Sequence, residues 1–424
     1  MTLLGVSVTH LRVIIRSSFC ACLLSISAGQ LTAHAEQSRR PLSMDLESFQ
    51  SGPDNRWAFS HLREVLPTVN IPRDQSGFQE LQISPNVVSD FSVDFQGGTQ
   101  SIHDIAASQY LDGLLIIKND EILVENYYGH LSESRPHLIN SMSKSIVGLL
   151  ARKIAADGLI DLDRPVSHYL PALSESGYGP DSLESLLDMR DGSKWSEDYE
   201  DLTSTFRIQD CATGWTDADY CPEIGPSSLY TFLPRVGRDP SKLGAFEYRS
   251  GSVNVIGWVL ESVTKQPLAD LISTYIWKPM GAEFDANITV DKGGFALADH
   301  GVSASLRDFG RFGLLMLNDG KSFGNQVIPS AVVNDILNQK GDPTWSLPSR
   351  PGYKPFYRSF WWGEGNPRGD IGGKGIHGQT LRVVPKADMV IVMYSSWPRA
   401  EANGDLVGWL QADELVDSLV AKFR

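Results

Sequence analysis

Short runs of apolar residues that predict β-strands lie toward the two ends of this chain. The stretch DGLLIIKNDEILVENYYGH (112–130) is rich in β-branched and aromatic residues on both sides of Asn119-Asp120. That pair favours a tight turn, so the stretch predicts a β-hairpin. Late in the chain, QTLRVVP (379–385) and ADMVIVMYSS (387–396) predict two further strands.

Helical spacing dominates the part of the chain between these strands. Residues 141–156 carry apolar side chains at Ile146, Leu149 and Ile154, and Gly158 follows as a stop signal. The same reasoning predicts helices over 252–264, about 304–318, and, with an amphipathic pattern, 405–423.

This order of elements predicts an α+β fold. We expect one antiparallel sheet built from both chain ends and flanked by helices, with a mostly helical insertion over about 155–300. Early in that insertion, between Gly158 and Leu173, we expect a turn, a short strand pair and a segment limited by proline. Residues 36–104 read as an extended lead-in with short helices, packed on a domain of residues 105–424.

The first 35 residues have the features of a secretory signal peptide. A weakly basic start is followed by an uncharged apolar stretch (17–31), and Ala33-His34-Ala35 fits a cleavage site before Glu36. A membrane anchor is the alternative, but the apolar stretch is short for a bilayer. We therefore expect an exported protein, periplasmic or secreted, with no membrane attachment after cleavage.

Charge and cysteine content narrow the choice of partners. The 424 residues carry a formal net charge of -14 without a Lys/Arg cluster, which argues against nucleic acid. Cleavage of the signal would leave two cysteines, Cys211 and Cys221, and in an oxidising compartment they are expected to form a disulfide. A metal site is the alternative, but no histidine lies close by in sequence and two ligands are too few. We expect no metal and no cofactor, and the sequence does not indicate an oligomeric state.

The first candidate for chemistry is Ser141-Met142-Ser143-Lys144, an S-x-x-K motif. One helical turn would put the serine hydroxyl and the lysine amine on one face, and a lysine with a lowered pKa can take the hydroxyl proton. A second S-x-x-K, Ser262 to Lys265, lies at the end of a predicted helix, where the dipole has the wrong sign for an oxyanion. We therefore favour Ser141, with a helix cap as the alternative role.

Two further motifs complete a candidate site. Tyr248-Arg249-Ser250 lies on a loop that leads into a helix, where a tyrosine could shuttle a proton. The similar motifs at Tyr357 and Tyr394 lie in stretches that look like core or strand. The glycine-rich GGKGIHGQTLRVVP (372–385) could let a substrate lie against a strand, and a backbone N–H there could complete an oxyanion hole with that of Ser141. The other interpretation of this segment is a simple turn.

Together these motifs resemble the serine β-lactamase and penicillin-binding-protein superfamily, over about residues 105–424. LLDMRDGSKWSEDY (186–199) and GKGIHGQ (373–379) are most similar to its class C-type branch, in particular to 6-aminohexanoate-dimer hydrolases and related carboxylesterases. The resemblance implies a β-lactamase/transpeptidase-like fold. It also implies a nucleophile, base, proton shuttle and oxyanion hole at Ser141, Lys144, Tyr248 and the N–H groups of Ser141 and Ile376, and a substrate contact at Tyr199. Ser250, Gly375 and His377 are further candidate substrate contacts.

The late strand departs from the pattern of that superfamily. True β-lactamases of this branch carry Lys-Thr-Gly there, whereas this chain has Gly373-Lys374-Gly375 or, in a shifted register, Lys374-Gly375-Ile376. Neither supplies the pair that grips a β-lactam carboxylate. His377, at the edge of the same strand, could either bind substrate or pack at the strand end, and Trp361-Trp362 could be core or pocket wall.

Three functions are consistent with these motifs. The favoured one is a serine hydrolase that cleaves an ester or amide bond of a small molecule through an acyl-enzyme on Ser141. A β-lactamase or D-alanyl-D-alanine-type peptidase with the same site is the second. The third is a catalytically silent ligand-binding module on this fold, against which the presence of Ser141, Lys144 and Tyr248 argues.

Overall fold

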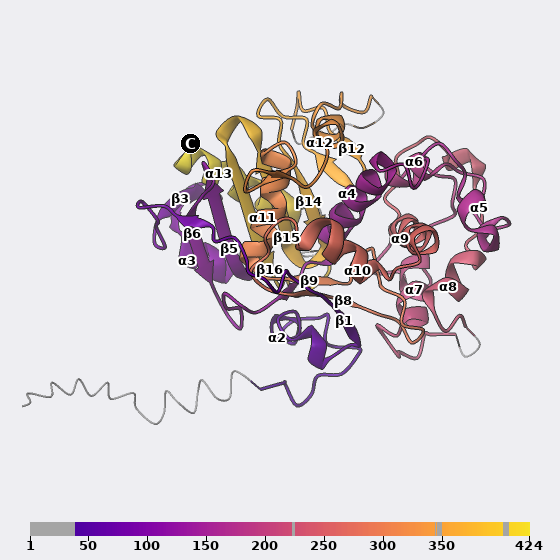
Figure 1. The fold of residues 1–424 in the computed structure, drawn as a ribbon. Coiled ribbons are helices and arrows are strands. Elements are labelled where there is room, and N and C mark those ends of the chain that lie inside the picture. Colours follow the sequence, from indigo (N-terminus) through magenta and orange to yellow (C-terminus); the bar gives the residue numbers. More distant parts are fainter. Residues whose placement is uncertain (1–38, 223–224, 344, 346–349, 402–406) are drawn as a thin grey trace, which may run out of the picture. The chain divides into compact units, whose positions relative to one another are not determined.

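Strands from both ends of the chain pair in one eight-stranded sheet, seen in the computed structural model in Figure 1. The structure describes residues 39–222, 225–343, 345, 350–401 and 407–424, so the expected signal peptide lies outside the described residues. The strand order is β12-β13-β14-β15-β16-β5-β6-β2, and all neighbours are antiparallel except β2 and β6. In that order the strands are Phe356–Arg358, Trp361–Gly363, Ile371–Gly375, Gln379–Val384, Met389–Ser395, Leu111–Lys118, Glu121–Tyr127 and Gln82–Ile83. The predicted antiparallel sheet built from both chain ends is confirmed.

The predicted hairpin forms β5 and β6. Asn119 and Asp120 both have left-handed backbone conformations, with φ of 50° and 61°, as a type I′ turn requires. Strand β5 then pairs with β16 from the far end of the chain, with Ile116 opposite Ile391. The centre of the sheet is therefore made by the two most apolar strands predicted from the sequence.

The two faces of the sheet are covered by different helices, which gives three layers. Leu114 and Ile116 pack in one cluster with helices α3 (Ile102–Ser108) and α13 (Val407–Phe423). The alternate residues Leu115 and Ile117 pack in another cluster with α4 (Ser143–Ala156) and α11 (Leu306–Leu317). Because side chains alternate across a strand, β5 serves both cores at once.

Helix α11 lies close to the sheet because glycines face the strands. A Cβ at Gly310 would come within 2.5 Å of Leu115, and one at Gly313 within 2.6 Å of Val390. Larger side chains at these positions would push the helix away from the sheet.

The middle of the chain is largely helical, as predicted, and the helices of residues 166–264 lie toward the right of Figure 1. The strand pair expected between Gly158 and Leu173 is wrong. Turns and a short helix occupy this stretch, and Pro165 forms only an isolated bridge to Ser182. Proline cannot donate to a ladder, and Pro165 instead caps the helix that follows. The helices are α5 (Val166–Tyr169), α6 (Leu183–Leu187), α7 (Thr205–Thr213), α8 (Leu229–Phe232), α9 (Ser250–Thr264), α10 (Leu268–Ile272) and α12 (Ser330–Leu337). Further short turns of helix are η3 (Pro171–Leu173), η4 (Leu233–Arg235), η5 (Pro240–Lys242) and η6 (Ser273–Trp277).

The lead-in contains more strand than the sequence predicted. Residues 40–424 form one compact unit. Short helices α2 (Asn55–Ala58) and η1 (Leu62–Glu64) are present, but β1, β3 and β4 were not foreseen. Each of these strands is four residues long, which is too short for local periodicity to reveal, and β1 in addition pairs with residues 286–289, far away in sequence. A four-stranded sheet runs in the order β1 (Thr68–Ile71), β8 (Ala286–Thr289), β9 (Val302–Ala304), β7 (His137–Leu138), and separate pairs are β3 (Ser92–Phe95) with β4 (Gly98–Ser101) and β10 (Lys321–Ser322) with β11 (Asn325–Gln326).

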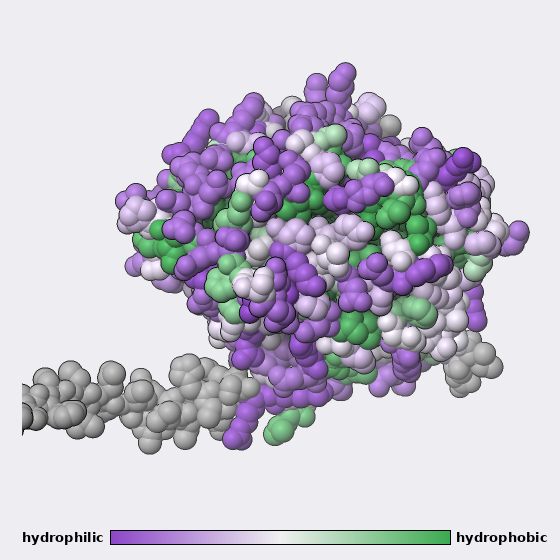
Figure 2. All heavy atoms as spheres, in the orientation of Figure 1, coloured by the Kyte–Doolittle hydropathy of each residue, from purple (hydrophilic) through white to green (hydrophobic). Residues whose placement is uncertain are grey.

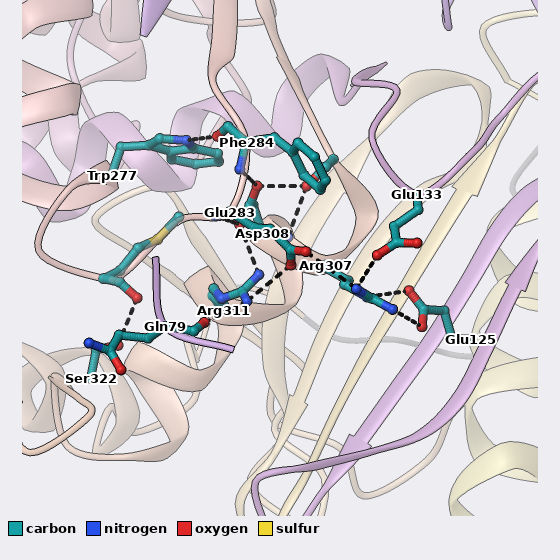
Figure 3. Close-up of polar contacts among 12 residues, drawn as sticks. Gln79, Glu125, Glu133, Trp277, Glu283, Phe284, Arg307, Asp308, Arg311 and Ser322 are labelled. Atoms are coloured by element: carbon teal, nitrogen blue, oxygen red, sulfur yellow. Dashed lines mark hydrogen bonds and ion pairs between the residues drawn. The ribbon is translucent and has the colours of Figure 1, made fainter. Parts of the chain in front are cut away.

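A buried ionic network fixes the start of α11 (Figure 3). The Asp308 carboxylate accepts hydrogen bonds from the backbone N–H groups of Glu283 at 2.7 Å and Phe284 at 2.9 Å. It also pairs with Arg311 at 3.0 Å, and the Arg311 guanidinium reaches the Glu283 carboxylate at 3.2 Å. Next to it, Arg307 binds carboxylates from the sheet and from the loop before β7.

The outer surface is mostly polar on the face drawn in Figure 2, where apolar patches are separated by hydrophilic side chains. Within the described residues, no helix combines the length and the apolar character that crossing a bilayer would require.

The network at α11 gives a prediction about stability. Replacing Asp308 by alanine removes one of the two carboxylates that pair with the buried Arg311 and leaves two backbone donors without their acceptor. We expect the free energy of unfolding to fall by about 3–5 kcal/mol. Glu133→Ala is the matched control, because Glu133 pairs with Arg307 in the same network but its side chain is 51% exposed. We expect the control to change the free energy by less than about 1 kcal/mol. Urea unfolding followed by circular dichroism measures both, and equal effects would contradict the network's role.

Candidate active site

Ser141 lies in a short turn of helix, η2 (Asn140–Met142), directly before α4. Asn140 has φ of 46°, which turns the chain from β7 into this helix. Lys144 stands one turn later, and its Nζ is 2.8 Å from the Ser141 Oγ. Nζ also donates to the backbone carbonyl of Asp299 at 2.9 Å. The spacing of the S-x-x-K motif thus becomes a direct contact between hydroxyl and amine.

Burial makes Lys144 a better base than an ordinary lysine. Its side chain is 1% exposed, and this burial lowers its pKa below the ordinary 10.5. The charges of Asp299 and Glu197 act in the opposite direction. Desolvation is the larger effect, so a larger fraction of this amine is neutral at a given pH than in a lysine exposed to solvent.

Tyr248 lies beside both residues, on the loop that enters α9. Its phenol lies next to the Ser141 side chain, and the Lys144 Nζ is 5.1 Å from the centre of its ring. Burial and the nearby Glu197 raise the pKa of Tyr248 well above 10, so the neutral phenol is the favoured form. The structure therefore brings Ser141, Lys144 and Tyr248 together.

The alternative motifs do not join this site. Tyr394 is buried in β16, where its hydroxyl donates to the Ser305 carbonyl at 3.2 Å. Tyr357 is buried in β12 and packs against the Tyr248 ring. Ser262 lies near the C-terminal end of α9, as predicted.

The end of β14 lies against the turn that carries Ser141. A Cβ at Gly375 would be 2.7 Å from the Ile139 carbonyl and 3.0 Å from the Ser141 backbone nitrogen, so only glycine allows this approach. The Asn140 side chain donates to the carbonyl of Ile376 at 3.0 Å and ties the two segments together.

Ser141 and Ile376 both line a cavity of about 420 Å³. Aromatic rings form much of its wall, and charged side chains lie between them. Of the two adjacent tryptophans, Trp361 is fully buried in the core, whereas Trp362 lines the cavity and stacks on Tyr248. The other lining residues are Glu197, Tyr199, Tyr248, Trp345, Arg350, Pro355, Gly363, Glu364, Lys374, Glu401, Trp409, Leu410 and Asp413.

The predicted substrate contacts fall in different places. Tyr199 lines the cavity, and its hydroxyl donates to Glu197 at 3.1 Å. Ser250 is fully buried and does not line the cavity, because its hydroxyl and backbone N–H both donate to Glu197. The interpretation of Ser250 as a substrate contact therefore needs correction: it binds a neighbouring side chain.

His377 also departs from the expected substrate contact. It is 3% exposed, and its Nδ1 is 2.7 Å from the Trp397 carbonyl. Burial lowers its pKa to about 4, so the ring is neutral near neutral pH. It borders a polar hollow on the other side of Ile376 rather than the cavity that contains Ser141. Of the two roles left open for His377, packing at the strand end is the one this arrangement supports.

The predicted disulfide is present and joins Cys211 in α7 to Cys221 in the following loop. Over the described ranges, no three His, Cys, Asp or Glu side chains gather in a way that could hold a metal ion.

Comparison with known proteins gives the same family from sequence and from structure. The Beta-lactamase family profile matches residues 106–415. A 6-aminohexanoate-dimer hydrolase from Paenarthrobacter ureafaciens is 34% identical over 361 residues, which cover 83% of this chain and 88% of the relative. The chain belongs to the beta-lactamase family. It is a serine hydrolase.

Solved structures agree with this assignment. A putative 6-aminohexanoate-dimer hydrolase from Bacillus anthracis superposes with a TM-score of 0.80 at 25% identity, covering 90% of this chain and 98% of that one. EstCE1, a hydrolase with promiscuous acyltransferase activity, superposes with a TM-score of 0.55 at 15% identity, covering 74% and 96%. At that identity the second likeness shows the beta-lactamase fold alone.

Sequence reasoning missed Glu197, the acidic centre of this beta-lactamase-family site. Its carboxylate accepts hydrogen bonds from Ser250, Tyr199 and the indole of Trp195, and it lines the cavity. Burial raises its pKa above the usual range for glutamate. Its position two residues before Tyr199 in WSEDYED was the available signal, but nothing in the pattern distinguished it from the other acids of that loop.

A second group that the sequence did not indicate lies behind Lys144. Gln209, Asn254 and Asp299 form a closed ring of hydrogen bonds, with lengths of 2.9, 2.9 and 3.3 Å. This ring fixes the Asp299 backbone, whose carbonyl accepts the hydrogen bond from Lys144. The three residues are far apart in sequence, so only the fold brings them together.

The lysine of the late strand is held in ion pairs. Lys374 contacts Glu364 at 3.1 Å and Asp413 at 3.3 Å. Arg382 binds the same two carboxylates, at 2.7 Å and 2.6 Å. Because its charge is balanced within the wall, Lys374 differs from the Lys-Thr pair that grips a carboxylate in β-lactamases of the class C-type branch.

The close approach at Gly375 gives a testable prediction. Gly375→Ala should push β14 away from the Ser141 turn and lower kcat/KM at least about 10-fold, because small displacements of reacting groups are costly. Gly98→Ala is the control, since a Cβ at Gly98 meets no atom within 4 Å. Steady-state hydrolysis of an activated ester measures both variants. A Gly375→Ala enzyme with wild-type kcat/KM would contradict the importance of this contact.

Proposed function

We propose that this hydrolase cleaves amide or ester bonds of small molecules through an acyl-enzyme on Ser141. The observation that carries the proposal is the 2.8 Å contact between the Ser141 Oγ and the buried Lys144 Nζ, at the wall of a cavity large enough for a small molecule. The names of the relatives, an aminohexanoate-dimer hydrolase and an esterase, support the same class of bond.

Acylation would use the three side chains in sequence. The neutral amine of Lys144 takes the proton of Ser141, and the Oγ attacks the substrate carbonyl carbon. The negative charge that forms on the carbonyl oxygen is stabilised by the backbone N–H groups of Ser141 and Ile376. The N-terminal end of α4 adds a favourable dipole at that point.

Tyr248 would complete the proton balance. Its high pKa keeps the phenol protonated, so it can donate a proton to the leaving nitrogen or oxygen as the carbon–heteroatom bond breaks. The Lys144 ammonium then returns a proton to the phenolate, which restores both groups. In deacylation a water molecule replaces the leaving group, and the same groups move its proton in the reverse direction.

The cavity supports a substrate with an apolar portion. Rings of Tyr199, Trp345, Trp362 and Trp409 line it together with Tyr248, and such walls favour aliphatic or aromatic chains. Hydrolysis of β-lactams by the same site is the second candidate, which the family assignment favours. The ion-paired Lys374 argues against efficient grip of a β-lactam carboxylate.

We also propose that the protein is exported and that residues 1–35 are removed. The disulfide between Cys211 and Cys221 supports an oxidising compartment. Intact-mass analysis of protein from a secretion-competent host should give a mature chain that begins at Glu36. A chain that retains Met1 in the exported fraction would contradict cleavage.

The nucleophile can be tested against an internal control. Wild-type protein should hydrolyse p-nitrophenyl butyrate and carry one butyryl group on the Ser141 peptide after rapid quenching. Ser141→Ala should lose both the activity and the adduct. Ser262→Ala, which removes the serine of the other S-x-x-K motif, should keep both. Retained turnover in Ser141→Ala would overturn the proposed function, and labelling of Ser141 by a fluorescent penicillin with slow release would favour the second candidate.

The base can be tested through pH dependence. Lys144→Ala should lower kcat by at least about 10²-fold, the scale of general-base loss, while Lys265→Ala should have little effect. In the wild type, a protonated amine cannot accept the serine proton, so kcat/KM should be low in acid. It should rise as pH passes the lowered pKa of Lys144 and level off before the ordinary lysine value of 10.5. A profile that is flat from pH 5 to 10 would contradict Lys144 as the base.

A further inference from the structure

The two proposed oxyanion donors each lie next to a residue in an uncommon backbone conformation. Asn140, directly before Ser141, has φ of 46°, and His377, directly after Ile376, has φ of 63°. Neither is glycine, and left-handed conformations of other residues persist where the surrounding structure fixes them. Contacts with other segments hold the turn at His377 in this conformation.

On the Ile376 side, hydrogen bonds join the turn to the segment after β16. The backbone N–H of His377 donates to the Ala400 carbonyl at 2.8 Å, and the His377 carbonyl accepts from the Trp397 N–H at 3.2 Å. The imidazole adds a third bond, from Nδ1 to the Trp397 carbonyl at 2.7 Å. Because a carbonyl only accepts, this bond requires the hydrogen on Nδ1.

The same carbonyl has a second donor, which comes from the N-terminal segment. Asn55, the first residue of α2, donates from Nδ2 to the Trp397 carbonyl at 2.7 Å. The Nδ2 of Asn55 and the Nδ1 of His377 are 3.4 Å apart and both carry hydrogens, so they share the acceptor rather than bond to each other. Asn55 is 1% exposed, and no solvent competes for this contact.

Other contacts hold α2 in place against this turn. The Phe59 ring packs edge-on against the His377 ring, with 5.0 Å between centres. The Gly52 N–H donates to the Pro398 carbonyl at 2.9 Å, and the Phe59 carbonyl accepts from the Leu138 N–H at 2.8 Å, in the strand before Ser141. The segment that carries α2 thus contacts both the strand before Ser141 and the segment that holds the turn after Ile376.

We propose that Asn55 and His377 are positioning residues that hold the backbone N–H of Ile376 toward the reaction centre, so that the segment before the family-matched region completes the oxyanion hole. This inference rests on the proposed function of Ser141 and Ile376. Asn55 lies outside residues 106–415, the part matched by the family profile. The side chains act through the Trp397 carbonyl and do not contact substrate.

Loss of this positioning should change kcat more than KM. Negative charge on the substrate oxygen develops in the transition state, so a displaced Ile376 N–H weakens transition-state binding more than ground-state binding. Loss of a whole oxyanion donor lowers kcat by about 10²–10³-fold. A donor that is present but misdirected should have a smaller effect, and we expect kcat to fall about 10- to 100-fold with KM within about twofold.

The experiment uses the full chain and three variants. Asn55→Leu removes the donor at similar volume, and His377→Gly removes the imidazole at a position whose φ suits glycine. The third variant combines both. Each is assayed with p-nitrophenyl butyrate, and each is titrated with butylboronic acid, which forms a tetrahedral adduct on a reactive serine and places a hydroxyl where the oxyanion would lie.

The expected pattern is specific to positioning. Boronate affinity should fall by the same factor as kcat/KM in both single variants, and the double variant should fall little further, because both side chains act on one carbonyl. Asn55→Ser is the milder second variant in case leucine prevents folding, and circular dichroism reports the folded fraction. Asn86→Leu, at an exposed asparagine of the same segment, is the matched control and should behave as wild type.

Three results would overturn the inference. Unchanged kcat and boronate affinity in folded Asn55→Leu and His377→Gly would remove any positioning role. A raised KM with unchanged kcat in His377→Gly would make His377 a direct substrate contact. Fully multiplicative losses in the double variant would mean that the two residues act independently. Failure of the proposed function is distinguishable from all three, because it would show as retained activity in Ser141→Ala.

Discussion

The active site depends on the burial of the Lys144 amine away from water. Lys144 can serve as a base only while its charged form is disfavoured, and its position inside the first turn of α4 achieves this by excluding water on every side. The packing of α4 against α9 and the sheet, the Asp299 carbonyl and the cover of Tyr248 all meet at this point. The site is therefore a property of the core and is not assembled on the surface.

Two negative charges nearby limit that effect. Asp299 is held ionised: burial opposes its charge, but His300 and Gln209 lower its pKa to about 2. Glu197 lies on the other side and is bound by several donors. Both favour the ammonium, so the pKa of Lys144 results from a balance between burial and these two carboxylates. Such a balance suits a group that must accept and release a proton in each cycle.

The sequence predicted what is local and missed what is assembled at long range. The Asn119-Asp120 hairpin, the strands around Leu381 and Ile391 and the helix after Ser141 follow from periodicity and turn chemistry, and the structure confirms them. The strands β1, β3 and β4 were missed because each spans only four residues, and β1 in addition depends on a distant partner, β8. The strand pair expected before Leu173 failed for a local reason, since proline interrupts the ladder.

The same distinction applies to the site. A motif spacing of one helical turn was enough to bring Ser141 and Lys144 together, and a loop before a helix was enough for Tyr248. Glu197 and the ring behind Lys144 have no spacing signature, because their partners come from separate elements. Ser250 and His377 show the limit of motif position as a signal, because their side chains bond to neighbouring groups, Glu197 and the Trp397 carbonyl.

The pairing of β5 with β16 has a consequence for how the chain reaches its native state. The central ladder of the sheet joins two strands that lie far apart in sequence, with Ile116 opposite Ile391. All the residues between the two strands must be synthesised before this ladder can close, and closure of so long a loop makes folding slow. Until then the chain remains without its central sheet.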